Sequence, residues 1–144
     1  MRVYLDNCSF NRPFDDQSQL RIQLETEAKL SIQNQIRNGE IELVWSYIID
    51  FENSANPFYE RKESIGEWKE MALLNVSESE EVLSKANDFQ ALGLKSKDSL
   101  HLACSAVTEC DFFFTTDDDI LKKKEQITGV EVLSPVGYII EYFK

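Results

Sequence analysis

The 144-residue chain lacks the features that mark dinucleotide enzymes, secreted proteins and membrane proteins. It has only five glycines, none arranged as a loop that cradles a phosphate or a dinucleotide, so we expect no nucleotide cofactor. No apolar run approaches the roughly 20 residues of a membrane helix. The first residues also lack the basic and then apolar pattern of a signal peptide. We therefore expect a cytoplasmic protein without membrane contact.

Cysteine and positive charge are scarce as well. The three cysteines, Cys8, Cys104 and Cys110, cannot all pair internally, and their spacing matches neither a zinc site nor a redox pair. We expect them to be small buried residues in a reducing compartment. Only 15 Lys and Arg accompany 26 Asp and Glu, so the net charge is -11. This charge disfavours indiscriminate binding to nucleic acid or to anionic membranes.

The order of apolar runs indicates a single domain over residues 1–144. We expect strands at residues 1–5, 40–45, 75–77, 111–116 and 130–133. We expect helices at residues 18–37, 47–53, 58–74, 77–93, 97–108, 120–126 and 135–143, and a loop at 8–17. Strands that alternate with helices are typical of right-handed parallel crossovers. The expected fold class is therefore α/β, a three-layer α/β/α sandwich around a central, mostly parallel sheet of about five strands.

Four acids stand where a carboxylate needs an explanation. Asp6 and Asp117 each follow an apolar strand, at the sheet edge where α/β folds bind ligands. Glu52 and Asp98 each lie on an otherwise apolar helix face, because their neighbours at three-and-four spacing are apolar. Four carboxylates in one pocket would repel one another unless a cation joined them. Oxygen ligands suit Mg²⁺ or Mn²⁺, the ions of phosphodiester and phosphoryl chemistry.

Each acid also has a structural interpretation. Asp98, in a first helical turn, would complement the helix dipole. Asp117 would cap the helix that follows it, and Glu52 would turn outward at a helix end. Asp6 is the hardest to explain in this way, because Asp is disfavoured in strands. The convergence of the four acids favours a shared site over four separate explanations.

These residues carry a resemblance that spans nearly the whole chain. The acidic signature of the PIN-domain ribonucleases is similar to four parts of it: Asp6 after the first strand, Glu52 in the helix that Ser46 opens, Lys97-Asp98-Ser99-Leu100-His101-Leu102-Ala103, and Phe114-Thr115-Thr116-Asp117. The segment around Asp98 is the most specific part. That family is a parallel α/β/α sandwich whose acids bind Mg²⁺ or Mn²⁺ to cleave RNA. Many of its small members are toxins that a partner antitoxin neutralises.

The resemblance implies a metal-dependent endoribonuclease and assigns roles residue by residue. The catalytic metal ligands would be Asp6, Glu52, Asp98 and Asp117. Asn7 and Thr116 would be polar supports, and Asp119 a spare acid. Arg12, Lys95 and Lys97 would contact RNA phosphates, whereas the run Lys122-Lys123-Lys124 is by default a solvated face. The expected partners are thus an RNA substrate and an antitoxin, with a homodimer as an open alternative.

His101 and two rival functions complete the expectations. We expect the only histidine to serve packing and local hydrogen bonding, with a metal or general-base role as the alternative; a single histidine excludes RNA hydrolysis by a histidine pair. One rival is a non-catalytic PIN-like subunit that binds protein. The other is a phosphatase or phosphoacceptor with Asp6 as nucleophile. Haloacid-type phosphatases have a second Asp two residues later, where this chain has Cys8, which disfavours that rival.

Overall fold

A computed structural model describes residues 1–142 and contains a five-stranded parallel sheet. The strands lie side by side in the order β3-β2-β1-β4-β5, and every neighbouring pair runs parallel. Their bounds are Arg2–Leu5 (β1), Glu42–Ser46 (β2), Leu74–Val76 (β3), Phe112–Phe114 (β4) and Glu131–Leu133 (β5). The expected class and strand number are confirmed.

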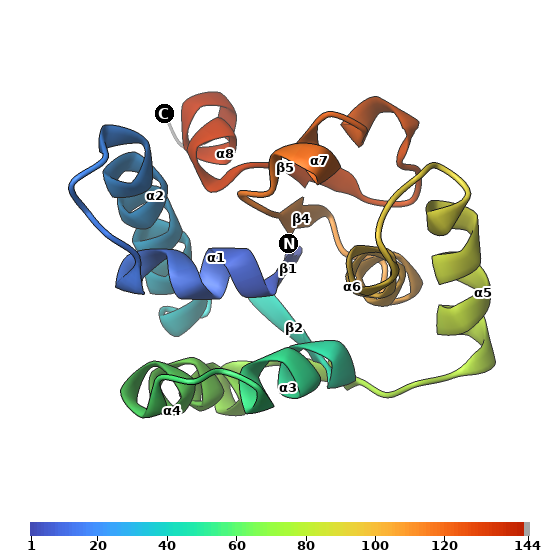
Figure 1. Cartoon of the computed structure of the whole chain (residues 1–144), viewed down its shortest axis with the longest axis horizontal. Coiled ribbons are helices and arrows are strands. Elements are labelled where there is room, and N and C mark those ends of the chain that lie inside the picture. Colours follow the sequence, from blue (N-terminus) through green and yellow to red (C-terminus); the bar gives the residue numbers. More distant parts are fainter. Residues whose placement is uncertain (143–144) are drawn as a thin grey trace.

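Helices cover both faces of this sheet and complete the three layers (Figure 1). On one side α2 (Leu20–Arg37) packs with α8 (Pro135–Tyr142), and on the other α5 (Glu80–Gln90) packs with α6 (Ser96–Val107). The shorter elements are α1 (Asn7–Asn11), η1 (Arg12–Phe14), α3 (Tyr47–Ser54), α4 (Tyr59–Glu67), η2 (Trp68–Met71), α7 (Asp118–Leu121) and η3 (Lys124–Gln126), where η marks a 3₁₀ turn. Residue 143, expected in the last helix, lies outside the described residues. None of the helices within 1–142 has the length and apolar character to cross a membrane.

Strands β1 and β4 are central, and the chain reverses its direction across the sheet between them. From β1 it proceeds through β2 to β3, whereas from β4 it proceeds the other way to β5. Both strands are apolar and buried, and the rings of Tyr4 and Phe113 stack with their centroids 5.4 Å apart. Right-handed crossovers leave the two strands toward opposite faces. A crevice therefore opens at their carboxyl ends, the usual ligand position in α/β sheets.

Most of the loop expected at residues 8–17 is helical: residues 8–14 lie in α1 and η1, and only 15–17 lie outside helices and strands. Asp6 starts α1 as its N-cap, because its Oδ1 accepts a hydrogen bond of 3.0 Å from the backbone N–H of Ser9. The apolar run before Asp6 indicates only that a strand ends there. The cap depends on the backbone turning at Asp6, which the hydrophobic pattern does not predict.

Two further boundaries differ from expectation, and one agrees. The helix expected over 77–93 starts later, because the hydroxyl of Ser79 is the cap that accepts from the N–H of Val82. The helix expected over 58–74 divides into α4, η2 and β3, since the N–H of Leu73 pairs with the carbonyl of Leu43 in the neighbouring β2. Helix α2 ends as expected before Gly39, whose φ of 75° suits glycine.

Helix α2 carries a charged side chain into the interior. Lys29 is only 3% exposed, and its ammonium group lies 5.2 Å from the ring centroid of Phe10 and 6.0 Å from that of Trp68. Burial, and then the charge of Arg37, lower the pKa of Lys29 from 10.5 to about 7, and no carboxylate offsets them. The folded protein therefore bears the cost of a buried charge at neutral and acidic pH.

We predict that Lys29→Met stabilises the protein, by roughly 1–3 kcal/mol at pH 6. Below about pH 7 both folded and unfolded chains hold the Lys29 proton, so the full cost is present. Between about pH 7 and 10.5 only the unfolded chain holds it, so wild-type stability rises with pH and the gain shrinks toward pH 10. Urea unfolding of both proteins at pH 6 and pH 10 measures this, with exposed Lys124→Met as control. A Lys29→Met protein that is less stable than wild type by the same amount at pH 6 and pH 10 would contradict the prediction.

Candidate active site

The first expected acid, Asp6, is fixed at the carboxyl end of β1. It is 3% exposed, and besides the bond from Ser9 its Oδ2 accepts one of 2.5 Å from the hydroxyl of Thr115. Burial raises the pKa of Asp6, whereas the Thr115 bond and the charge of His101 lower it. Each oxygen accepts one hydrogen bond, which fixes the orientation of the Asp6 carboxylate and leaves each oxygen a further acceptor site.

The second acid, Asp117, follows β4 and caps α7, as its structural interpretation predicted. Its Oδ1 accepts hydrogen bonds from the N–H groups of Asp119 at 2.8 Å and Ile120 at 3.4 Å. This cap starts α7 at Asp118, earlier than the helix expected over 120–126. Thr115 joins the two strand ends, because its Oγ1 accepts from the N–H of Asp117 at 3.0 Å while its proton goes to Asp6. Both capping hydrogen bonds go to Oδ1 of Asp117, and neither goes to its Oδ2.

Helices α3 and α6 carry the other two acids. Ser46 caps α3 as expected, accepting from the N–H of Ile49 at 3.3 Å, and Glu52 lies in the second half of that helix. Asp98 lies in the first turn of α6. Both carboxylates are half-buried. In Figure 1, α1, α3, α6 and α7 surround the middle of the molecule, where β1 ends.

The four acids act on one another. The pKa of Asp98 is raised to about 6, first by burial and then by the charges of Asp117, Asp6 and Glu52, whereas His101 lowers it. Cys104 and Cys110 are buried as expected, whereas Cys8 is exposed. Desolvation, and then the charges of Asp6, Asp117, Asp98 and Glu52, raise the pKa of the Cys8 thiol. The structure thus brings the four predicted acids into one electrostatic cluster.

The chemistry of this cluster fits a hard divalent cation. Its donors are carboxylate oxygens, which Mg²⁺ and Mn²⁺ prefer. Two buried hydroxyls next to the acids in the chain, Ser99 Oγ and Thr116 Oγ1, have no hydrogen-bond partner within residues 1–142, and such groups are uncommon in protein interiors. As placed, no three His, Cys, Asp or Glu side chains of the described residues form a group that holds a metal. The four acids affect one another electrostatically but do not form a coordination shell as placed. Their roles as metal ligands stay predictions.

His101 packs in the interior as expected, but its hydrogen bonds are not local. It is buried, and its two ring nitrogens make hydrogen bonds to residues far away in the chain: Nε2 to Glu52 Oε1, and Nδ1 to the hydroxyl of Tyr4 at 2.5 Å. That hydroxyl also lies 2.6 Å from Ser46 Oγ. An ionised carboxylate only accepts, so Nε2 of His101 donates to Glu52. The chain of bonds holds Glu52 in place.

Sequence reasoning missed the residues that fix the acids. Thr115 and Ser9 bind Asp6, and Tyr4 supports Glu52 through the histidine. The expected support Asn7 instead accepts a side-chain hydrogen bond from Asn11, 3.0 Å away on α1. Thr115 stood in the motif that carries the resemblance, but nothing in the sequence distinguished its role from that of Thr116. Tyr4 read as an ordinary apolar strand residue.

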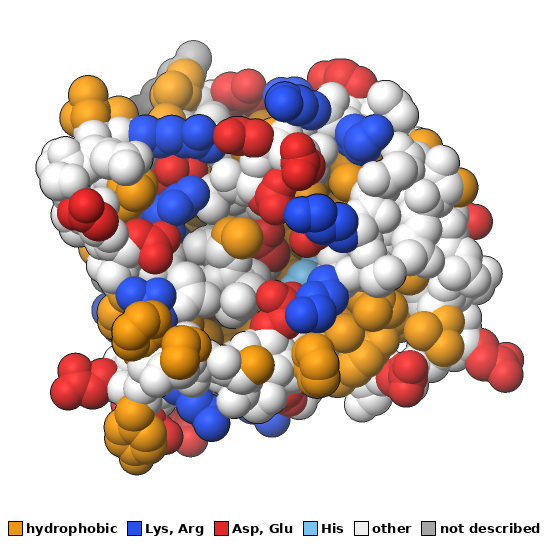
Figure 2. Space-filling model, viewed as in Figure 1, with side chains coloured by type: hydrophobic (Ala, Val, Ile, Leu, Met, Phe, Trp, Pro, Cys, Tyr) orange, Lys and Arg blue, Asp and Glu red, His pale blue; other side chains and the backbone are white. Residues whose placement is uncertain are grey.

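Basic side chains lie beside the acids. A pocket of about 360 Å³ next to Asp98 is also lined by Lys95, Asp119, Lys122 and Lys123. Figure 2 shows acidic and basic side chains gathered around a hollow in the middle of this face, with the pale blue of histidine visible in it. Lys97 instead lies over the exposed ring of Phe51, 5.4 Å from its centroid. Lys95, which was expected to contact RNA, lines the pocket beside Asp98. Lys122 lines it too and is exposed, as expected for a solvated face.

Arg12, the third cation expected to contact RNA, is used internally. Its guanidinium pairs with Asp15 at 3.1 Å and with the buried Glu25 at 3.4 Å. Arg21 also pairs with Glu25, and it reaches Asp118 at 2.7 Å and the carbonyl of Thr116 at 3.4 Å. This arginine ties α2 to the loop that carries Asp117. The role expected for Arg12 has no support in its geometry.

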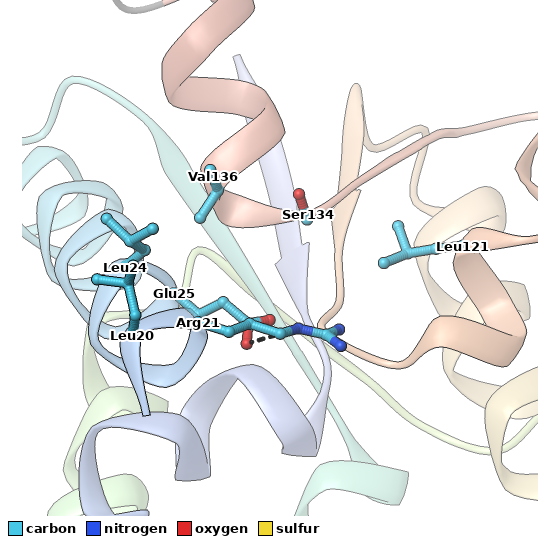
Figure 3. Close-up of a pocket in the computed structure, with 7 residues that line it drawn as sticks. All are labelled: Leu20, Arg21, Leu24, Glu25, Leu121, Ser134 and Val136. Carbon is cyan, nitrogen blue, oxygen red and sulfur yellow. Dashed lines mark ion pairs between the residues drawn. The ribbon is translucent and has the colours of Figure 1, made fainter. Parts of the chain in front are cut away.

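A larger hollow of about 390 Å³ lies between α2, α7 and α8, away from the acid cluster (Figure 3). Its walls are mostly apolar, with Leu20, Leu24, Leu121 and Val136. Its one carboxylate is Glu25, which Figure 3 shows paired with Arg21. It offers no unpaired acid for chemistry.

Comparisons with known proteins show the fold. No protein-family model and no curated protein matches the chain. A similar solved structure is the crystal structure of VapBC2 from Rickettsia felis bound to a DNA fragment from the promoter. It is 12% identical, covers 93% of this chain and 98% of its own, and has a TM-score of 0.57. At that identity the likeness establishes a PIN-like three-layer α/β/α fold and no more.

We predict that His101→Ala lowers the free energy of unfolding by about 2–4 kcal/mol. The change opens a cavity and leaves the buried hydroxyl of Tyr4 and the carboxylate of Glu52 without the imidazole. His101→Asn is the matched variant, because its shorter amide retains an acceptor near Tyr4 but is too short for Glu52; it should lose less. Urea unfolding in EDTA measures both. An alanine variant as stable as wild type would show that the network contributes nothing.

Proposed function

We propose that this protein is a metal-dependent endoribonuclease that hydrolyses RNA phosphodiester bonds. The observation that carries the proposal is the convergence of four acids on one edge of the sheet: Asp6 and Asp117 follow β1 and β4, and α3 and α6 add Glu52 and Asp98. Burial, and then the charges of Asp117, Asp6 and Glu52, raise the pKa of Asp98 in support of it. Such concentrated negative charge is expensive to hold together. It is typical of sites that bind a cation for phosphoryl chemistry.

Each part of the site has a task under this proposal. Asp6, Glu52, Asp98 and Asp117 would hold Mg²⁺ or Mn²⁺, which when bound supplies an activated water and a positive charge for the phosphate. Thr115 fixes Asp6, and His101 fixes Glu52. Lys95 and Lys122, in the pocket beside Asp98, are placed to attract the phosphates that flank the cleaved bond. They give local attraction within a chain of net charge -11.

The proposal extends to a partner protein. The family that the sequence resembles includes many toxins paired with antitoxins, and the structural neighbour VapBC2 is bound to promoter DNA. We therefore infer that this chain acts as the toxin of such a pair. Support for this part rests on the resemblance and on the fold alone.

We predict cleavage of single-stranded RNA with Mg²⁺ or Mn²⁺ that stops when EDTA is added and returns with excess metal. Asp98→Asn should lower the cleavage rate at least about 100-fold, because the amide keeps the shape but removes the charge that a cation needs. Asp88→Asn is the matched control, since Asp88 is an exposed acid on α5 outside the cluster. A gel assay with a fluorescent RNA measures the cleavage rates of wild type, Asp98→Asn and Asp88→Asn.

Two results of that assay would sink the proposal. One is cleavage that EDTA leaves unchanged. The other is an Asp98→Asn protein as active as Asp88→Asn.

A further inference from the structure

A separate pocket of about 230 Å³ lies between α2 and the segment formed by α4 and η2. None of the four clustered acids lines it. Helix α2 contributes Lys29, Gln33 and Arg37, whose spacing of four places them on one helix face. Phe10, Phe14 and Trp68 are its aromatic residues. The pocket therefore combines three hydrogen-bond donors from one helix with three aromatic rings.

Two of these donors, Lys29 and Gln33, are buried, whereas Arg37 is exposed to water. Gln33 is 4% exposed, and its Nε2 is buried without a hydrogen-bond partner within residues 1–142. The ammonium of Lys29 and the guanidinium of Arg37, the latter 4.8 Å from Trp68, both lie over aromatic rings. The lining has one carboxylate, Glu67, which is exposed and forms no ion pair with either cation among the described residues.

This combination is costly unless something fills it. A buried amide or ammonium without an acceptor loses hydrogen bonds that water would have supplied. The chain has 26 acidic residues, yet within residues 1–142 no carboxylate pairs with Lys29 or Gln33. An occupant with acceptor oxygens would satisfy the three donors together, since lysine, amide and guanidinium groups all donate to oxyanions. The volume admits a single small group rather than a polymer.

We propose that the pocket lined by Lys29, Gln33, Arg37, Phe10 and Trp68 binds the oxyanion, carboxylate or phosphate, of a small molecule. The site requires no metal ion and is independent of RNA cleavage. It is a ligand site additional to the acid cluster.

The test is an NMR titration of the indole N–H of Trp68 in EDTA at pH 6.5. The probes are inorganic phosphate and acetate, each compared with chloride at equal ionic strength. Trp45 provides a reference, because its indole N–H is bound to Asp50 at 2.8 Å. The proteins are wild type, Lys29→Met, Arg37→Met and the exposed-lysine control Lys124→Met. The predicted stability of Lys29→Met keeps a loss of binding distinct from unfolding.

The expected result is a saturable shift of Trp68 in wild type and Lys124→Met. Lys29→Met and Arg37→Met should bind at least about tenfold more weakly. Tighter binding of phosphate would identify a phosphorylated ligand, and tighter binding of acetate a carboxylate. The absence of a saturable shift with both anions would overturn the proposal. Equal affinity in wild type and Lys29→Met would overturn it too.

Discussion

The mutual repulsion of four carboxylates is the constraint around which this structure is arranged. Asp6 and Asp117 end the two central strands where the chain reverses across the sheet, and α3 and α6 add Glu52 and Asp98. Burial, and then the charges of Asp117, Asp6 and Glu52, raise the pKa of Asp98. A fold that keeps such a cluster needs other interactions to hold each acid in position, and the buried bonds around it supply them.

The hydrogen bonds that hold the acids are made by residues of the protein interior. Thr115 binds both strand-end acids, while Tyr4 and His101 connect the interior of β1 to Glu52 on α3. Fold and site therefore share residues: Asp6 also starts α1, and Ser46 both caps α3 and contacts Tyr4. Arg21 likewise connects α2 to the loop of Asp117, because it bonds to Asp118 and to the carbonyl of Thr116.

The sequence predicted what periodicity and composition control. Apolar runs that end in acids indicated β1 and β4, and helix faces with one acid indicated Glu52 and Asp98. It did not predict contacts between residues distant in the chain, such as Tyr4 with His101, since nothing local marks them. It also missed α1, because the cap by Asp6 depends on a backbone turn, and it did not predict the ion pair of Arg12 with the distant Glu25.

Thermal melting of wild type and Asp98→Asn, in EDTA and then with Mn²⁺, tests the shared cluster most directly. If the four charges repel, removing one should relieve about 1 kcal/mol and raise the midpoint in EDTA by roughly 2–4 °C. Mn²⁺ should then raise the midpoint of wild type far more than that of the variant, because a ligand of the native state alone stabilises it. Asp98→Asn melting at or below wild type in EDTA, with an equal response to Mn²⁺, would contradict the account.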